Sequence, residues 1–393
     1  MIKALWLTSW YPNKLDALNG DFIQRHAKAV SMFCKVNVIH LEADRNNELP
    51  QATEITVQHY GNLTETIVLY KIINFPVFGK LFSIIRYIII FKKQVKKYIA
   101  ENGKPDIVHV HVPVKAGLIA LWLKRRYNIA FVVTEHWAIY NDTAEDAYPK
   151  RNFFFKYFTE KILENAAAFL PVSKNLGEAV QQMVAPVSFN AIPNVADTNY
   201  FNNDMPFNKE NVFRFVHVST LKYQKNPEGI LRAFAKFCLH FPNVQLVMVG
   251  EVPQGLLQYA GELNIPAECI SFEGVQPYEN VAEIVKQSHA MIMFSRFENL
   301  PCVIIEALCC GLPVISTNVG GIPELIDKSN GILVNSEDED ALFNAMLDVY
   351  QNYKNYNNAA IAEKARNDFS YTVIGEKIVN IYSEIIGNNI KRK

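Results

Sequence analysis

The sequence predicts an α/β fold made of two doubly wound domains, each a mostly parallel sheet with helices on both faces. Three observations lead to this prediction. Short apolar runs alternate with amphipathic segments through nearly all of the 393 residues. Hydrophobic residues make up 50% of the chain and charged residues 20%, which is typical of a folded globular protein. At roughly 150 residues per domain, the length provides for two or three hydrophobic cores.

In the first half, six short apolar runs are predicted strands: 4–7, 36–40, 107–111, 131–134, 167–171 and 188–192. Helical periodicity fills most of the gaps between them, at 22–33, 114–126 and 153–165. Parallel strands need such helical crossover connections, so this alternation favours a parallel sheet. One segment differs: two strand-like runs within 55–73 flank Gly61-Asn62, which predicts a β-hairpin.

The second half repeats the pattern, with predicted strands at 214–218, 244–249, 270–272, 290–294, 313–316 and 331–334, and helices at 227–240 and 301–310. Between the halves, residues 199–211 are rich in Asn and lack apolar periodicity, which predicts a linker. We therefore expect domains at 1–200 and 206–370, with a final helix at about 371–393 packing back on the first. Two such sheets facing each other would leave a ligand-binding cleft at the carboxyl ends of their strands.

Charge, cysteines and hydropathy restrict the class of protein. The 39 Lys and Arg residues balance 39 Asp and Glu residues, which excludes a nucleic-acid protein that acts through a bulk basic field. The six cysteines show no CxxC spacing, so we expect reduced thiols without a disulfide or zinc site. The N-terminus turns polar too early for a signal peptide, and the apolar run 81–91 is shorter than the roughly 20 residues of a membrane span. These features predict a cytoplasmic protein.

The most informative segment is 295–323, where a predicted strand is followed by Glu298, Pro301, a helical run and Gly311. The helix start near Leu300 offers unpaired backbone N–H groups that can bind hydroxyl or phosphate oxygens. Glu306 follows Glu298 by eight residues, which on an ideal helix separates them by roughly 80° and 12 Å. They would then touch different parts of an extended ligand. In the alternative interpretation, Glu298 only offsets the helix dipole and Glu306 is a solvated helix-face residue.

This segment resembles the donor site of retaining glycosyltransferases of family 4, which have the two-domain GT-B fold. The resemblance lies in the Glu298 and Glu306 pair, in the segment 311–314, and in Gly320-Gly321-Ile322-Pro323-Glu324. Residues 20–27 resemble the first loop and helix of the same family, where the resemblance implies that Gly20 lets the backbone approach the donor diphosphate. A glycine can do so because it has no side chain, although an ordinary turn would also use one.

Histidines form a second group of candidates. Thr134-Glu135-His136-Trp137 follows a predicted strand and resembles the family, which implies that His136 forms a hydrogen bond with the donor sugar; a structural histidine at a strand end is the alternative. His109 and His111 point to one face of their strand. No Cys or carboxylate with ligand spacing accompanies them, so packed or cleft-lining histidines are favoured over a metal site.

In the second domain, the segment 216–226 resembles the family's diphosphate-binding loop. Lys225 matches the usual lysine, but Thr220 stands where an arginine is usual. One charge-assisted hydrogen bond, worth about 1.5–3 kcal/mol, is therefore missing or is supplied by Lys222 or Arg296. The segment 272–275, which includes Gly274 and Val275, resembles the part that contacts the nucleobase.

The resemblance implies transfer of a sugar, with retention, from a UDP-sugar or GDP-sugar to a saccharide or lipid-linked acceptor in surface polysaccharide or glycolipid synthesis, without metal or cofactor. The implied catalytic residues are His136 and Glu298. The implied donor-binding residues are Gly20, Lys225, Gly274, Val275, Asn299, Leu300 and Glu306. Two alternatives stay open: a sugar-nucleotide 2-epimerase, and an inert subunit that binds nucleotide-sugars.

The balanced charge conceals a basic first half. Residues 1–205 contain 23 Lys and Arg against 18 Asp and Glu, whereas residues 206–393 contain 16 against 21. Lys80 to Lys104 include seven basic residues and one acid, Glu101, beside an aromatic-aliphatic run. This segment predicts a basic amphipathic element that binds an anionic membrane surface, and hence a peripheral location on its cytoplasmic face. The alternative is a core helix with one solvated face.

Overall fold

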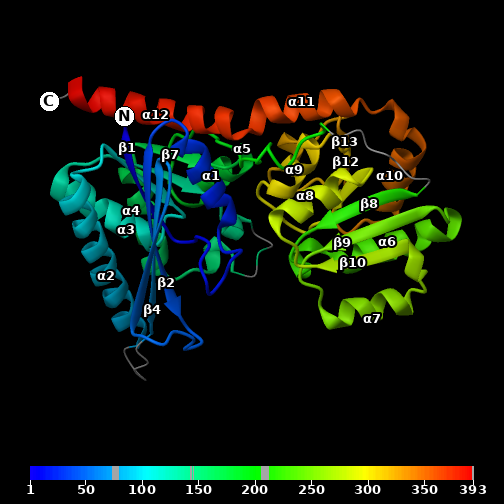
Figure 1. Cartoon of the computed structure of the whole chain (residues 1–393), viewed down its shortest axis with the longest axis horizontal. Coiled ribbons are helices and arrows are strands. Elements are labelled where there is room, and N and C mark those ends of the chain that lie inside the picture. Colours follow the sequence, from blue (N-terminus) through cyan, green and yellow to red (C-terminus); the bar gives the residue numbers. More distant parts are fainter. Residues whose placement is uncertain (73–78, 142–143, 145, 205–211, 392–393) are drawn as a thin grey trace. The chain divides into compact units, whose positions relative to one another are not determined.

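The computed structural model describes residues 1–72, 79–141, 144, 146–204 and 212–391. The chain divides into two compact units, which are treated separately below. The first, here unit 1, comprises residues 1–193 and 371–393; the second, unit 2, comprises residues 194–370. Each unit has a sheet of largely parallel strands covered by helices (Figure 1), so the predicted α/β class is confirmed.

Unit 1 has a seven-stranded sheet with the order β3-β4-β2-β1-β5-β6-β7. Its strands are β1 (Lys3–Thr8), β2 (Lys35–Asp44), β3 (Thr53–Tyr60), β4 (Leu63–Lys71), β5 (Ile107–His111), β6 (Phe131–Glu135) and β7 (Ala168–Pro171). The edge strand β3 pairs antiparallel with β4, which confirms the predicted hairpin. All other neighbours are parallel. The register places Thr8, His111 and Thr134 side by side at the carboxyl edge of the sheet.

The predicted strand at 188–192 is wrong. This run forms only an isolated bridge between Phe189 and Phe169 of β7. The N–H groups of Asn190 and Ile192 donate to β7 carbonyls, but Pro193 has no N–H with which to extend the ladder.

Helices cover both faces of the unit 1 sheet. The helices α2 (Gly79–Asn102), α3 (Ala116–Tyr127) and α4 (Phe153–Asn165) connect strands that advance in one direction across the sheet. Right-handed crossovers therefore place all three on one face. On the other face lies α1 (Asp21–Ser31), with α12 (Tyr371–Lys391) packed beside it (Figure 1). The remaining α-helix, α5 (Lys174–Met183), follows β7.

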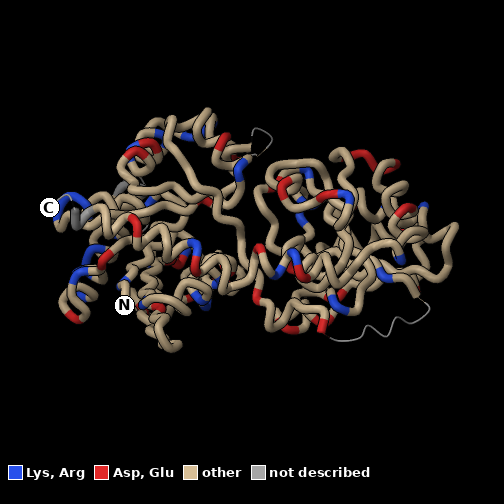
Figure 2. Tube along the Cα trace, turned by 90° about the horizontal axis from the view of Figure 1, so that it is seen from above, with Lys and Arg blue, Asp and Glu red and all other residues tan. Residues whose placement is uncertain are grey.

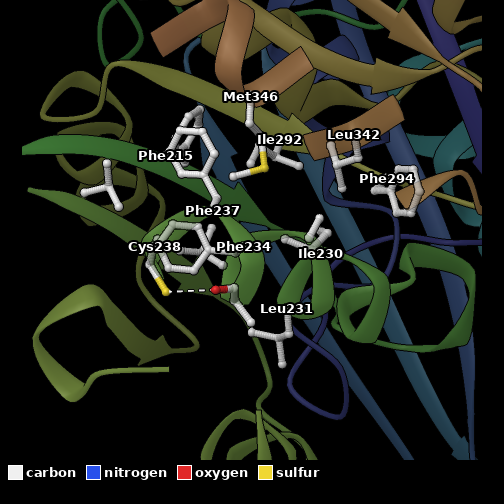
Figure 3. Close-up of a cluster of buried hydrophobic side chains, with 14 of the residues drawn as sticks. Phe215, Ile230, Leu231, Phe234, Phe237, Cys238, Ile292, Phe294, Leu342 and Met346 are labelled. Carbon is white, nitrogen blue, oxygen red and sulfur yellow. Dashed lines mark hydrogen bonds between the residues drawn. The ribbon is translucent and has the colours of Figure 1, made fainter. Parts of the chain in front are cut away.

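Unit 2 has a six-stranded parallel sheet with the order β10-β9-β8-β11-β12-β13. The strands are β8 (Phe213–Val218), β9 (Val244–Val249), β10 (Ile270–Gly274), β11 (Ala290–Met293), β12 (Val314–Thr317) and β13 (Gly331–Val334). The helices are α6 (Pro227–His240), α7 (Gln254–Glu262), α8 (Tyr278–Lys286), α9 (Cys302–Cys309), α10 (Glu339–Asn352) and α11 (Asn358–Phe369). Figure 3 shows the core beneath this sheet, where Phe234 and Phe237 of α6 meet Ile292 of β11 and Met346 of α10.

The chain passes from unit 1 to unit 2 between Pro193 and Asn194. Residues 194–200, which the sequence prediction assigns to the first domain, thus belong to unit 2. Asn194 Nδ2 donates to the carbonyl of Leu300 at 2.6 Å, and the fully buried Phe201 packs against the Tyr278 ring with centroids 5.0 Å apart. Of the predicted linker 199–211, residues 205–211 lie outside the described residues.

Charged residues of both signs occur along both units, as Figure 2 shows. Among the helices of the described ranges, none combines the length and apolar character needed to cross a lipid bilayer.

Candidate active site

In unit 2, two neighbouring strands bring Glu298 and Lys225 together. Glu298 lies in the loop after β11, and Lys225 ends a short 3₁₀ turn (Tyr223–Lys225) after β8. Because β8 and β11 are adjacent and parallel, the loops at their carboxyl ends meet. The Lys225 ammonium forms an ion pair with the Glu298 carboxylate, which also accepts a hydrogen bond of 2.9 Å from Ser295 Oγ. Glu298 is only 6% exposed, so these partners offset the loss of hydration of its charge.

The two loops are fastened to each other on both sides of this pair. The backbone N–H of Arg296 donates to Gln224 O at 2.8 Å, and Gln224 Nε2 donates to Phe297 O at 2.9 Å. The Arg296 guanidinium stacks 4.1 Å from the Tyr223 ring centroid and pairs with Glu337 at 2.9 Å. Arg296 therefore holds the loop. Of Lys222 and Arg296, the two residues suggested to replace the arginine expected at position 220, Lys222 is exposed and Arg296 is half-buried.

The Gly-Gly-Ile-Pro segment, residues 320–323, packs against the loop that carries Glu298. Gly320 has a φ of +57°, and a Cβ atom there would lie 1.9 Å from the carbonyl oxygen of Glu298. The next residue, Gly321, donates its N–H to Asn299 O at 2.8 Å. A side chain at position 320 would thus displace the backbone that carries Glu298 and Asn299.

Helix α9 begins directly after this loop. Pro301 occupies its N-cap position and offers no side-chain oxygen to the first-turn N–H groups. Leu300 is buried, and its carbonyl is held by Asn194. The helix start therefore presents backbone donors and the positive end of the helix dipole beside Asn299 and Leu300, an arrangement suited to anionic oxygens.

Glu306 has different partners from Glu298. It lies in α9, is 2% exposed, and accepts a hydrogen bond of 2.9 Å from Tyr278 Oη of α8. The alternative that Glu306 is a solvated helix-face residue is therefore wrong. The structure brings Glu298 together with Lys225, whereas Glu306 is held by a tyrosine.

Gly274 and Val275 stand at the end of β10, on the edge of the unit 2 sheet. The Gly274 carbonyl accepts a hydrogen bond of 2.9 Å from Gly250 N. No described atom lies within 4 Å of the position that a Cβ of Gly274 would occupy, and Val275 is exposed. In the sheet, β9 lies between β10 and β8, so Gly274 and Val275 follow a strand that is not adjacent to those preceding Lys225 and Glu298.

In unit 1, His136 follows β6 and is held by the residue before it. The Glu135 carboxylate accepts hydrogen bonds from the backbone N–H of His136 at 2.8 Å and of Trp137 at 2.9 Å. It also accepts one from Tyr140 Oη at 3.0 Å. Burial raises the pKa of Glu135 to about 7. Glu135 therefore fixes the backbone at the position where the side chain of His136 begins.

Three more buried histidines surround His136. His111 Nδ1 lies 3.1 Å from His136 Nε2, and the two rings stack with centroids 5.4 Å apart. The His26 ring of α1 lies 5.6 Å from the His136 ring, while His109 contacts Thr134 and Tyr382. Burial lowers the pKa of His26 to about 4, and lowers the pKa values of His109 and His111 well below their usual range. These three imidazoles are therefore neutral at physiological pH.

A neutral His111 carries a single ring proton. A neutral imidazole has one donor and one acceptor nitrogen. Within the described part of the chain, buried His111 Nε2 has no hydrogen-bond partner. A proton on that atom would be an unsatisfied buried donor, at a cost of about 1–3 kcal/mol. The same cost applies to a proton on buried His136 Nδ1, so either ring can donate in the hydrogen bond between His111 Nδ1 and His136 Nε2.

Gly20 precedes α1 and lies against Trp10. Its φ is +66°, and a Cβ atom there would lie 2.8 Å from the backbone carbon of Trp10. The Trp10 ring contacts Trp137, and Phe22, two residues after Gly20, contacts the His136 ring at 4.8 Å. Gly20 and His136 thus belong to one aromatic cluster at the carboxyl edge of the unit 1 sheet.

Three supporting residues were not predicted from the sequence: Ser295, Tyr278 and Glu135. Ser295 directly follows a strand and precedes Glu298 by three residues, a spacing that could have identified it. Tyr278 gives no local signal, because its contact with Glu306 joins two separate helices. Over the described residues, no group of three or more His, Cys, Asp or Glu side chains is arranged to hold a metal ion.

Comparison with known proteins agrees with this arrangement. The family model "Glycosyltransferase Family 4" matches residues 34–200, and the model "Glycosyl transferases group 1" matches residues 202–368. N-acetyl-alpha-D-glucosaminyl L-malate synthase of Bacillus anthracis is 28% identical over 300 residues, which cover 73% of this chain and 76% of that protein.

Solved structures resemble the chain over nearly its full length. Sucrose-phosphate synthase from Thermosynechococcus elongatus has a TM-score of 0.77 at 18% identity, covering 98% of this chain and 100% of that one. Anabaena HepE in complex with UDP and glucose has a TM-score of 0.71 at 16% identity, covering 97% and 100%. The chain therefore has the GT-B fold and belongs to the group 1 glycosyltransferases of family 4.

Proposed function

We propose that this glycosyltransferase transfers a sugar, with retention of configuration, from a UDP-sugar or GDP-sugar to a saccharide or lipid-linked acceptor in surface polysaccharide or glycolipid synthesis. The observation that carries the proposal is the pair of half-buried Lys225 and buried Glu298 beside the start of α9, where Pro301 makes no side-chain cap hydrogen bond. HepE, which has the same fold, was solved with UDP and glucose, and this supports a nucleotide-sugar donor.

Unit 2 supplies the groups that would hold the donor. A lysine ammonium has three N–H donors, and Lys225 directs one to Glu298, which leaves two for diphosphate oxygens. The first-turn N–H groups of α9, beside Asn299 and Leu300, add neutral donors for the same anion. We assign the nucleobase to the exposed end of β10 at Gly274 and Val275, and a supporting role in donor binding to Glu306.

The chemistry requires charge to be stabilised on the leaving diphosphate as the anomeric bond breaks. Lys225 and the α9 amides are preorganised for that charge, which is the most effective form of electrostatic catalysis. The Glu298 carboxylate can accept hydrogen bonds from sugar hydroxyls. In unit 1, we assign His136 to a hydrogen bond with the donor sugar, and Gly20 to close backbone approach to the diphosphate. These groups need no metal or cofactor, and we expect activity to survive chelation by EDTA.

The test is donor turnover without an acceptor. Slow release of free sugar and nucleoside diphosphate is the expected result. Interconversion of sugar isomers would instead identify a 2-epimerase, and donor binding without turnover in the presence of any acceptor would identify an inert binding subunit. A thermal-shift screen of nucleoside diphosphates and their sugars should select the base first, since a ligand that binds only the native state stabilises it.

The basic segment 80–104 of unit 1 supports an acceptor at an anionic membrane surface, with the protein bound peripherally on its cytoplasmic side.

A further inference from the structure

Helix α2 shows an unusual distribution of side chains. Its buried face consists of Tyr87, Phe91, Val95 and Tyr98. The opposite, outward face is also apolar over its first half, where Ile85 is 42% and Ile89 is 62% exposed. A core helix with an ordinary solvated face would carry polar side chains there.

The outward face of α2 turns basic toward its C-terminal end. Lys93, Lys96 and Lys97 continue the stripe that Ile85 and Ile89 begin, at the spacing of successive helical turns. All three lysines are exposed, and Glu101, on the last turn, is the one acid of this helix. An apolar half followed by a cationic half matches the acyl region and the anionic headgroups of a lipid surface.

A second exposed apolar cluster lies at the start of α4. Phe153 is 73% and Phe154 70% exposed, and their rings contact each other at 5.8 Å. Tyr157 stacks on Phe153, one turn further along. Lys150 and Arg151 precede the cluster, and Lys156 lies within it.

The fold places these two clusters at the same end of one layer. α2, α3 and α4 cover one face of the unit 1 sheet (Figure 1), and α3 contacts both of its neighbours. Each helix runs antiparallel to the strands, so all three begin at the carboxyl edge of the sheet. Ile85, Ile89, Phe153 and Phe154 therefore share that end of the layer. Between them, Trp122 of α3 is covered by the Lys92 ammonium, which lies 5.2 Å from the ring centroid.

We propose that this end of the α2–α3–α4 layer is a docking surface for an anionic lipid bilayer, with the α4 aromatic residues as a second insertion point besides α2. The basic side chains around the apolar clusters favour a lipid surface over a partner protein with an apolar patch alone. The inference deepens the proposed function because it names the surface at which the enzyme would meet its acceptor. Only this link to the acceptor rests on the proposed function.

Vesicle co-sedimentation of the full chain tests the proposal. Wild type should bind vesicles of equal parts phosphatidylcholine and phosphatidylglycerol, bind pure phosphatidylcholine weakly, and be released by high salt. Phe153→Ser with Phe154→Ser should weaken binding at least about tenfold, and Lys93→Glu with Lys96→Glu should do the same. Leu239→Ser, at an exposed leucine of unit 2, and Lys354→Glu are matched controls that should bind as wild type does.

Two results would overturn the proposal: no binding to the anionic vesicles at low salt, or binding that the α4 variant leaves unchanged. Light scattering can give a third result that would overturn it. If wild type self-associates and the α4 variant does not, the surface is a protein interface. Donor hydrolysis measured without vesicles separates the proposed membrane surface from the proposed function. If the chain binds vesicles but turns over no donor, the proposed function alone is refuted.

Discussion

The Lys225–Glu298 pair of unit 2 and the His111–His136 pair of unit 1 both lie at or after the carboxyl ends of strands, yet they differ in the charge they carry. The first is an ion pair, supported by Ser295 and by loops fastened on both sides. The second joins two imidazoles, of which His111 is held neutral by burial. The comparison teaches that full charge is retained in unit 2, where we propose that the diphosphate binds. In unit 1 the pair is instead a hydrogen bond between two imidazole rings.

Glu298→Gln should have the largest effect, and it tests the ion pair between Lys225 and Glu298 in unit 2. The amide keeps the size of the side chain but removes the negative charge that pairs with Lys225. We expect transfer to fall about a thousandfold, equivalent to about 4 kcal/mol, while the Kd for the nucleoside diphosphate changes much less. Steady-state kinetics and calorimetry measure the two quantities. Glu363→Gln, on an exposed face of α11, is the control; equal losses in transfer and nucleotide affinity would contradict the assigned sugar role.

The next largest effect is expected from acidification, which should destabilise unit 1 before unit 2. Burial lowers the pKa of His26 to about 4, so the unfolded chain takes up a proton near pH 6.5 that folded His26 does not. Stability from neutral His26 is therefore full above pH 6.5 and is lost as the pH falls to 4, by about 3 kcal/mol. His109 and His111 act in the same direction, whereas unit 2 has His217, with a pKa of about 4.

Glu135 opposes this trend, because its raised pKa of about 7 destabilises the folded state above pH 7 and this penalty fades toward pH 4.5. Acidification lowers the stability of unit 1 through three histidines and raises it through one carboxyl, Glu135. Unit 1 should therefore still lose the protection of its amide hydrogens before unit 2. Hydrogen exchange with mass spectrometry, corrected for intrinsic rates, measures this order. Loss of protection in unit 2 at the same or a higher pH would refute it, and His26→Leu should flatten the response of unit 1.

Glycine substitutions compare the backbone supports of the two sites. Gly320→Ala should destabilise the fold by about 3 kcal/mol and Gly20→Ala by about 2, because the contact at position 320 is the closer. Gly61→Ala is the control: it shares a positive φ but would meet no neighbour within 4 Å, so we expect about 1 kcal/mol. Urea unfolding gives the three values. If Gly61→Ala were as damaging as the others, strain in φ rather than crowding would be the cause.

The smallest expected effect concerns the hydrogen bond between His111 and His136 in unit 1. His111→Leu removes the hydrogen-bond partner of His136 Nε2, and we expect a loss in kcat of about tenfold. His111→Asn can place an amide N–H near the same point and should recover most of it. ¹⁵N NMR of the imidazoles should show one preferred tautomer of His136 in wild type and a mixture of tautomers in His111→Leu. The exposed His59→Leu is the control; an unchanged tautomer in His111→Leu would refute the coupling.

Local sequence pattern was sufficient for most of the fold. The ranges 107–111, 153–165, 227–240 and 331–334 match elements of the structure residue for residue, because each is a continuous apolar or amphipathic run with clear ends. The run 188–192 has the same composition but lies at a sheet margin, where Pro193 stops the pairing. Composition does not distinguish these two environments.

The candidate site was predictable where its residues are close in sequence. Glu298, Asn299 and Leu300 lie in one loop, and the resemblance added Lys225, which the structure places against Glu298. The contacts of Glu306 with Tyr278 and of His111 with His136 join segments 28 and 25 residues apart. Such contacts depend on helix packing and sheet register, which no local pattern encodes.

The return of α12 to unit 1 makes that unit discontinuous along the chain. Tyr382 of α12 is fully buried there and contacts His109 of β5. Residues 371–391 leave the ribosome only after all 177 residues of the intervening unit have been made. Unit 2 can therefore complete its core during synthesis, whereas unit 1 must wait with α1 and His109 lacking their contacts with α12, and is the part of a nascent chain that a chaperone would have most reason to hold.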